Sequence, residues 1–278
     1  MERIKHAIEK DKKLHSSSAV LPDKPLVNSP ATTENISPET QYELDTVNYT
    51  HTRVVRLQAE HLEKHRIVAF NKNDAISMNF DLLRTHVLQK MEEKGWRTLA
   101  ITSPTPGAGK TVVAINLAMS IAQQTNKTAM LVDFDLRRPK IGSYMGLPME
   151  KSLNNLLDDT ATLPEVLVNP DTPRLVILAT KTPVKKSTET LSSKKITNLV
   201  KELRERYEER IVIFDLPPIL ATDDAIALLP QIDCVLLVVA NGMSSKKEIE
   251  DSIRLLPKES LLGTVLNKAE VDPMSYYY

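Results

Sequence analysis

Residues 103–111 read SPTPGAGKT, and the prediction of the fold starts from them. It follows the apolar run TLAIT (98–102) and leads directly into a helical pattern over 111–124. Gly107 and Gly109 let backbone N–H groups close around phosphate oxygens without interference from a Cβ atom. The start of the following helix adds the positive end of its dipole. The stretch therefore predicts a nucleotide phosphate site between a strand and a helix.

The loop also predicts a nucleotide and Mg²⁺ as cofactors. Lys110 is placed to reach the β- and γ-phosphates, and the Thr111 hydroxyl is placed to ligate Mg²⁺. Pro104 departs from the strict pattern, because it stands where the first glycine of a P-loop would be. We expect the nucleotide to be bound by Pro106, Gly107, Ala108, Gly109, Lys110, Thr111 and Val112.

Around this loop, short apolar runs alternate with helical stretches. The apolar runs lie at 98–102, 129–135, 174–180, 211–215, 233–240 and 261–267. A helix with one buried face precedes them, since apolar residues recur at helical spacing between Ile76 and Met91. Repeated alternation of strand and helix predicts an α/β fold of the P-loop NTPase class, with a mostly parallel β-sheet covered by helices on both faces.

The two ends of the chain lie outside this pattern. The first 15 residues indicate a short helix, and residues 16–52 are rich in Ser, Thr, Pro and Asn, which is typical of a flexible linker. We expect an N-terminal helix and linker over 1–73, a nucleotide-binding domain over 74–272 and a tyrosine-rich tail over 273–278. The tail carries Tyr276, Tyr277 and Tyr278. Side chains at a chain terminus have little to pack against, so we do not expect these tyrosines to belong to the core.

Carboxylates follow two later apolar runs. The run LVDFD places Asp133 and Asp135 two residues apart on one face at a strand end, and IVIFD ends in Asp215. Ligands bind at the carboxyl ends of parallel strands, so we expect these side chains near the phosphate loop. One aspartate of the first pair can hold Mg²⁺ while the other accepts a proton. Asp215 is placed to orient the metal or its water shell.

Composition excludes several classes of function. The 36 Lys and Arg residues balance 36 Asp and Glu residues, which gives no electrostatic reason to expect a nucleic-acid partner. All six histidines lie before residue 87, so the larger part of the chain has no Ser-His-Asp arrangement and no His-ligated zinc. Cys234, the one cysteine, is expected to be a buried strand residue. With no secretory signal and no apolar run of membrane length, we expect a cytoplasmic protein.

The ordered set of motifs resembles the bacterial tyrosine kinases of capsule and exopolysaccharide loci, over residues 74–278. SPTPGAGKT is similar to the Walker A loop of that family, which likewise has proline in the first-glycine position. LVDFDLRRP resembles its second aspartate motif, and IVIFDLPPIL resembles its Walker B motif. STETLSS, ATDDA, GTVLNK and the tyrosine cluster follow in the order of the family.

The resemblance implies an ATP-dependent protein-tyrosine autokinase that regulates polysaccharide polymerisation and export. It implies a homo-oligomer that phosphorylates its tyrosine cluster between neighbouring subunits. It also implies a separate membrane-embedded polysaccharide co-polymerase as activator, which would hold the protein at the inner face of the membrane. The phosphoacceptors would be Tyr276, Tyr277 and Tyr278.

The resemblance also assigns roles to the site residues. Lys110 and Thr111 would hold the phosphates and the metal, and Asp133 would accept the proton of the tyrosine hydroxyl. Asp135 and Asp215 would lie around the metal. The implied catalytic set is thus Lys110, Asp133, Asp135 and Asp215, and the implied metal set is Thr111, Asp135 and Asp215.

The sequence departs from the family at two places. The ring-forming motif Glu-x-x-Arg-x-x-Arg reads Met78, Asp81 and Arg84 here, which leaves the oligomeric state open. Ala108 replaces the acidic residue that is common before the second loop glycine.

Three other functions stay open. A non-kinase ATPase switch that positions division machinery or plasmids would carry a lysine early in the loop, where Thr105 stands. A GTPase would read guanine with an NKxD motif, but here Glu270 ends that motif, and in the kinase interpretation Asn267 contacts the adenine. A nucleotide-binding regulatory subunit of the polysaccharide machinery is the third alternative.

Overall fold

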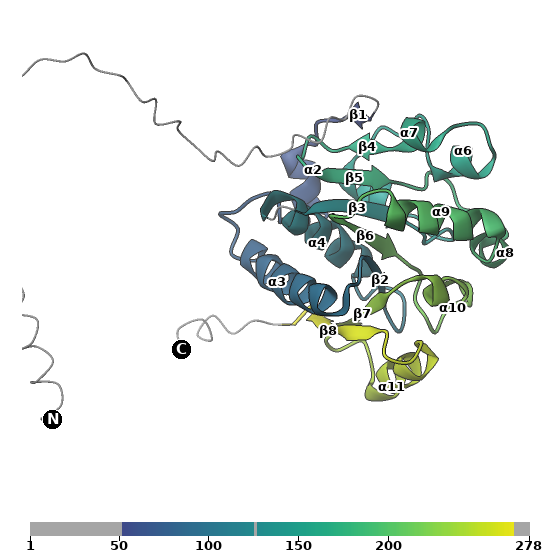
Figure 1. The fold of residues 1–278 in the computed structure, drawn as a ribbon. Coiled ribbons are helices and arrows are strands. Elements are labelled where there is room, and N and C mark those ends of the chain that lie inside the picture. Colours follow the sequence, from purple (N-terminus) through teal and green to yellow (C-terminus); the bar gives the residue numbers. More distant parts are fainter. Residues whose placement is uncertain (1–51, 125–126, 270–278) are drawn as a thin grey trace, which may run out of the picture. The chain divides into compact units, whose positions relative to one another are not determined.

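The apolar run that precedes the phosphate loop forms a central strand of a mostly parallel sheet. The computed structural model of the protein describes residues 52–124 and 127–269. Within them, β2 (Thr98–Thr102) belongs to an eight-stranded sheet ordered β1-β4-β5-β3-β6-β2-β7-β8 (Figure 1). All neighbouring strands run parallel except β4 and β5. The remaining strands are β1 (Arg53–Val54), β3 (Thr128–Asp133), β4 (Val168–Asn169), β5 (Leu175–Leu178), β6 (Arg210–Asp215), β7 (Cys234–Ala240) and β8 (Leu261–Asn267).

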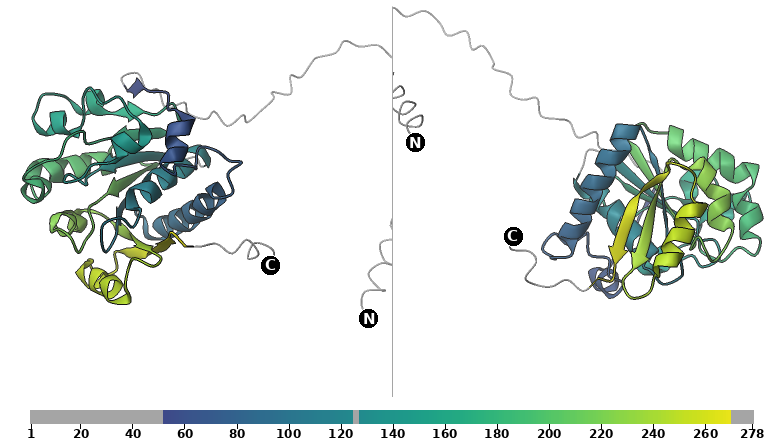
Figure 2. Two further views of the ribbon diagram at one scale, coloured as in Figure 1. Left: turned by 180° about the vertical axis from the view of Figure 1, so that it is seen from behind. Right: turned by 90° about the horizontal axis from the view of Figure 1, so that it is seen from below.

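Both faces of the sheet are buried beneath helices. Strand residues alternate between the faces, so that Leu99 and Ile101 pack in one core and Ala100 packs in the other. Helices α3 (Ser77–Lys94) and α4 (Lys110–Gln124) cover the first face (Figure 2). Helices α9 (Lys194–Glu205) and α10 (Asp224–Leu228) cover the second. This confirms the predicted α/β arrangement.

Short elements complete the fold. Helix α9 is separated from the short helix before it by Ser192 and Ser193, and the Ser193 side chain caps α9 by accepting a hydrogen bond from the backbone of Ile196. Cys234 is fully buried, as predicted, and burial raises the pKa of its thiol. The short elements are α2 (Ala59–Lys64), α5 (Ile141–Met145), α6 (Leu153–Leu157), α7 (Leu163–Val166), α8 (Ser187–Leu191), a 3₁₀ turn at Leu229–Gln231 and α11 (Lys246–Leu255).

The folded part begins before residue 74, where the sequence placed its start. Ile67 is fully buried in the core, and the side chain of Asn116 in α4 fixes the backbone around it. Asn116 Oδ1 accepts hydrogen bonds from the backbone N–H groups of Val68 (2.7 Å) and Ala69 (2.9 Å). Its Nδ2 donates to the carbonyl of Arg66 at 3.0 Å. Residues 53–70 were missed because their apolar positions follow neither a helical nor a strand period.

The predictions for the two ends of the chain concern residues that the structure does not describe. The helix predicted over residues 1–15, the linker predicted over 16–52 except for its last residue, and the tail over 273–278 lie outside the described residues. Within the described residues, no helix is both long and apolar enough to cross a bilayer.

We predict that Asn116→Ala destabilises the protein by about 2–6 kcal/mol, because two backbone N–H groups would lose their shared acceptor, each at about 1–3 kcal/mol. Urea unfolding monitored by circular dichroism measures the change. Asn73→Ala is the matched control, since its side chain is exposed, and we expect a shift within about 0.5 kcal/mol. Equal stability of the two variants would contradict the inference that the Asn116 side chain holds the backbone of residues 66–69 in place.

Candidate active site

Three strands bring the predicted polar residues to one edge of the sheet. The phosphate loop follows β2, Asp133 ends β3, and Asp215 ends β6. Asp133 and Asp215 are register partners on adjacent strands, and Ile101 of β2 is the partner of Asp215 on its other side. Because parallel strands end at the same edge, residues that are far apart in sequence converge on the start of α4.

The phosphate loop depends on glycine and on a neighbouring strand. Gly107 has φ +85° and Gly109 has φ +91°, a region that favours glycine. Asn267, at the end of β8, donates a hydrogen bond from Nδ2 to the carbonyl of Ala108 at 2.8 Å. A Cβ atom on Gly109 would lie 2.2 Å from that same Nδ2. Asn267 therefore holds the loop from the side of β8.

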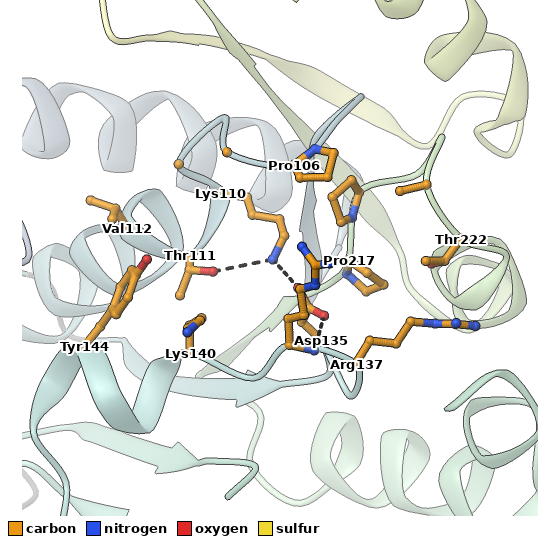
Figure 3. Close-up of a pocket in the computed structure, with 15 residues that line it drawn as sticks. Pro106, Lys110, Thr111, Val112, Asp135, Arg137, Lys140, Tyr144, Pro217 and Thr222 are labelled. Carbon is orange, nitrogen blue, oxygen red and sulfur yellow. Dashed lines mark hydrogen bonds and ion pairs between the residues drawn. The ribbon is translucent and has the colours of Figure 1, made fainter. Parts of the chain in front are cut away.

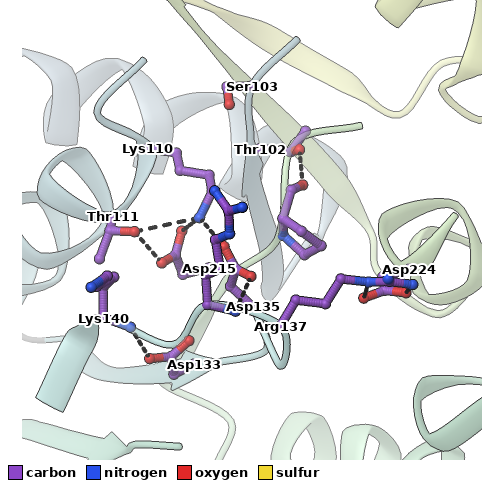
Figure 4. A network of polar contacts seen from close by, with 12 residues as sticks. Thr102, Ser103, Lys110, Thr111, Asp133, Asp135, Arg137, Lys140, Asp215 and Asp224 are labelled. Carbon is purple, nitrogen blue, oxygen red and sulfur yellow. Dashed lines mark hydrogen bonds and ion pairs between the residues drawn. The ribbon is translucent and has the colours of Figure 1, made fainter. Parts of the chain in front are cut away.

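A hydrogen-bonded network joins the start of α4 to the two carboxylates (Figure 4). Lys110 Nζ lies 2.8 Å from Asp135 Oδ2 and 3.4 Å from Asp215 Oδ1. The Thr111 hydroxyl donates to Asp215 Oδ2 at 2.6 Å. Burial by itself would lower the pKa of Lys110, but the charges of Asp215 and Asp135 outweigh it and raise that pKa. The lysine is therefore held as a cation where phosphates would arrive.

Asp133 lies behind this network. Its Oδ2 accepts hydrogen bonds from the backbone N–H groups of Lys140 and Ile141, both at 3.0 Å. Its Oδ1 is buried and has no hydrogen-bond partner among the described residues. Burial, followed by the charge of Asp215, raises the pKa of Asp133 well above its ordinary value. Burial also raises the pKa of Asp215, although Lys110 and Thr111 oppose that shift.

A cavity of about 450 Å³ opens in front of the network (Figure 3). Seven of the residues predicted to bind nucleotide or metal line this cavity, whereas Ala108, Asn267 and Asp215 do not. Asp133, the predicted proton acceptor, is also absent from the lining. The complete lining is Pro106, Gly107, Gly109, Lys110, Thr111, Val112, Asp135, Arg137, Arg138, Lys140, Tyr144, Pro217, Pro218, Ala221 and Thr222.

Sequence reasoning missed an ion pair that joins two walls of the cavity. Arg137 donates from Nε to Asp224 Oδ2 at 2.9 Å and from Nη2 to Oδ1 at 3.0 Å. Asp224 is fully buried, and burial by itself would raise the pKa of its carboxyl. The hydrogen bonds from Arg137 and Thr188 outweigh burial and lower that pKa. The motifs LRRP and ATDDA contain these residues, but no signal in one sequence pairs them.

With this geometry in view, comparison with known proteins identifies the family. A family model described as an AAA domain matches residues 96–258. Tyrosine-protein kinase YwqD of Bacillus subtilis is 30% identical over 203 residues, which cover 72% of this chain and 84% of that protein. The chain belongs to the bacterial tyrosine kinase family. It is accordingly an enzyme of the protein-tyrosine kinase class.

Solved structures give the same result. The kinase domain of Escherichia coli tyrosine kinase ETK superposes with a TM-score of 0.68 at 25% identity, over 81% of this chain and 92% of that chain. The septum site-determining protein MinD of Pyrococcus horikoshii, complexed with Mg-ADP, reaches a TM-score of 0.51 at 20% identity, over 64% and 74% of the two chains. The second likeness shows the P-loop NTPase fold alone.

We predict that Gly109→Ala weakens ATP-analogue binding by at least about tenfold. A side chain in this backbone region costs roughly 1–2 kcal/mol, and its Cβ would also displace Asn267. Isothermal titration calorimetry measures the affinity. Gly95→Ala is the matched control, because Gly95 has φ +66° but open space around its Cβ position. Equal affinities of the two variants would contradict the close contact between loop and β8.

Proposed function

We propose that this chain is an ATP- and Mg²⁺-dependent autokinase whose acceptors are Tyr276, Tyr277 and Tyr278. The observation that carries the proposal is the convergence of Lys110 with two carboxylates beside the cavity, Asp135 after β3 and Asp215 at the end of β6, in a member of the tyrosine kinase family. Phosphoryl transfer requires mainly positioning and charge neutralisation. The three consecutive tyrosines supply acceptor hydroxyls in the same chain.

The transfer step follows from these groups. The tyrosine oxygen attacks the γ-phosphorus, the bond from γ-phosphorus to the β,γ-bridging oxygen breaks, and ADP leaves with that electron pair. Lys110 neutralises charge on the phosphates. The hydroxyl proton passes to Asp133, whose raised pKa suits a proton acceptor. Because Asp133 is fully buried, this role requires the segment 136–141 to shift.

The oxygen atoms beside Lys110 fit a magnesium ion. Mg²⁺ takes oxygen ligands and is usually bound by one or two carboxylates together with substrate phosphates. Thr111, Asp135 and Asp215 offer a hydroxyl and two carboxylates within one hydrogen-bonded network. These residues would hold the ion, which supplies charge neutralisation at the phosphates.

Asn267 is proposed as the adenine contact. Its amide orientation is fixed, because Nδ2 donates to the carbonyl of Ala108. The remaining Oδ1 is an acceptor that suits the exocyclic amino group of adenine. This contact is the one proposed for ATP as the phosphoryl donor.

The biological role proposed for the kinase is control of capsule or exopolysaccharide polymerisation and export. A separate membrane co-polymerase would activate it and hold it at the inner face of the membrane, and transfer would occur between subunits. Arg84 is the one arginine of the ring motif that is present here, and it forms an ion pair within the chain with Asp81 at 3.1 Å. Ser120 also donates to Asp81 at 2.6 Å. The exposed Met78 therefore offers an apolar contact at this helix in place of an ionic one.

We predict that the chain gains mass in steps of one phosphoryl group when it is incubated with ATP and Mg²⁺. Intact-mass spectrometry with peptide mapping should place these steps on Tyr276, Tyr277 or Tyr278. Lys110→Met should abolish them, because the phosphates lose their buried cation. The triple variant Tyr276→Phe, Tyr277→Phe, Tyr278→Phe should bind ATP and gain no mass. Hydrolysis of ATP without added mass in the parent would favour an ATPase switch instead.

We predict that Asp133→Asn lowers the phosphoryl-transfer rate by about 10²–10⁴-fold, the usual contribution of general acid–base catalysis. The amide oxygen of the asparagine can still accept the bonds from Lys140 and Ile141, so folding should be retained. Single-turnover kinetics measure the rate, and circular dichroism checks the fold. Asp158→Asn, which lies outside the cavity, is the matched control. An unchanged rate in Asp133→Asn would contradict the proposal that Asp133 accepts the hydroxyl proton.

A further inference from the structure

One wall of the cavity carries three basic side chains in addition to Lys110. Arg137, Arg138 and Lys140 line it, beyond Lys110 and the phosphate loop. We refer to these three residues as the basic rim. Asp135 is the one carboxylate among the lining residues, and it already faces Lys110.

The rim is held in place by its own backbone. The N–H of Arg138 donates to Asp135 Oδ1 at 3.0 Å, and the N–H of Lys140 donates to Asp133 Oδ2 at 3.0 Å. Arg137 is fixed by its paired bonds to buried Asp224. In this conformation the segment presents its cations at the cavity.

The charges of the rim are only partly compensated. Asp224 and Asp223 offset Arg137, at 2.9 Å and 3.7 Å. Arg138 and Lys140 are exposed, and within residues 52–124 and 127–269 neither side chain has a hydrogen-bond or ion-pair partner. Two cations thus remain available to an anion that enters the cavity.

The acceptor must approach from this side. In phosphoryl transfer the attacking and leaving oxygens lie roughly in line with the γ-phosphorus. Lys110 and the phosphate loop occupy the side of the leaving group, so the acceptor faces the rest of the lining. That remainder consists of the basic rim, Tyr144 and the segment 217–222.

Adjacent acceptors create an electrostatic problem that the rim can solve. After one transfer, the next tyrosine to react lies directly beside a phosphotyrosine, whose charge is about −1.5 to −2. Neighbouring Cα atoms are only about 3.8 Å apart, so this anion enters the cavity region together with the acceptor. Without nearby cations, the anion and the bound nucleotide would repel each other.

We propose that the basic rim is a binding subsite for a phosphotyrosine adjacent to the acceptor, so that the first phosphorylation of the cluster promotes the next. This subsite rests on the proposed kinase function. Arg138 offers a planar fork of N–H donors that matches a phosphate, and Lys140 adds a point charge. The substrate class is therefore a tyrosine peptide that already carries a neighbouring phosphate.

A binding experiment tests the subsite without phosphoryl transfer. The full chain carries Tyr276→Phe, Tyr277→Phe and Tyr278→Phe to remove its own acceptors. It is loaded with a non-hydrolysable ATP analogue and Mg²⁺, which fills the γ-phosphate position. The probes are fluorescent peptides of sequence Pro-Met-Ser-Tyr-Tyr-Tyr, unmodified or with phosphotyrosine at the middle tyrosine. Fluorescence anisotropy gives each dissociation constant.

We expect the phosphopeptide to bind at least about tenfold more tightly than the unmodified peptide, the effect of one charge-assisted hydrogen bond. In Arg138→Gln with Lys140→Gln, the two peptides should bind within about twofold of each other. Lys201→Gln with Lys258→Gln removes the same charge from exposed positions outside the cavity and should keep the preference.

Three results would overturn the subsite: equal affinities in the parent, a preference that survives in the rim variant, or an equal loss in the control variant. Failure of the proposed kinase function is a separate result. In that case the phosphopeptide preference would persist, while the parent chain would transfer no phosphate to tyrosine in the mass measurement.

Discussion

A lysine held between two carboxylates is the interaction on which this site depends. Lys110, Asp135 and Asp215 are all largely or fully buried, with side-chain exposures of 12%, 7% and 0%. An unpaired charge at such positions costs several kcal/mol, so each group tolerates burial only because the others are present. In the proposed mechanism, phosphates at Lys110 would replace its carboxylate partners with another anion and would leave those carboxylates to ligate the metal. In the structure, the pairing compensates the three buried charges.

The fold serves that interaction by aligning strand ends. The register that pairs Asp133 with Asp215 places one carboxylate behind the other, and β2 delivers the phosphate loop beside them. The loop is constrained on its far side by Asn267, which leaves no room for a side chain at Gly109. The ends of β2, β3, β6 and β8 and the start of α4 therefore surround the phosphate loop, and the segment 136–141 carries the rim residues at the cavity.

The sequence predicted much of this arrangement, for a physical reason. Central parallel strands are buried on both faces, so β2, β3, β6 and β7 read as largely apolar runs with clear ends. The phosphate loop and the three aspartates follow those ends directly. The two-residue strands β1 and β4 were missed, since so short a strand has no pattern. The bonds from Asn116 to residues 66–69, and from Arg137 to Asp224, are tertiary contacts that one sequence does not encode locally.

Asp133 shows where the prediction of chemistry from sequence is incomplete. Its spacing from Asp135 predicted two carboxylates on one face, but the structure places Asp135 at the cavity and Asp133 behind it. The reason is that the chain turns after β3, so that Lys140 and Ile141 close over Asp133 with their N–H groups. Burial then raises the pKa of Asp133, a property that spacing alone does not reveal.

The fate of the γ-phosphate distinguishes a kinase that phosphorylates its own tyrosine cluster from an ATPase switch. In a single turnover with γ-labelled ATP and Mg²⁺, a tyrosine kinase places the label on tyrosine, whereas an ATPase switch releases it as inorganic phosphate. We predict that the label appears on the tyrosine cluster at the rate at which ATP disappears. Complete recovery of the label as inorganic phosphate, with every tyrosine unmodified, would contradict the assignment.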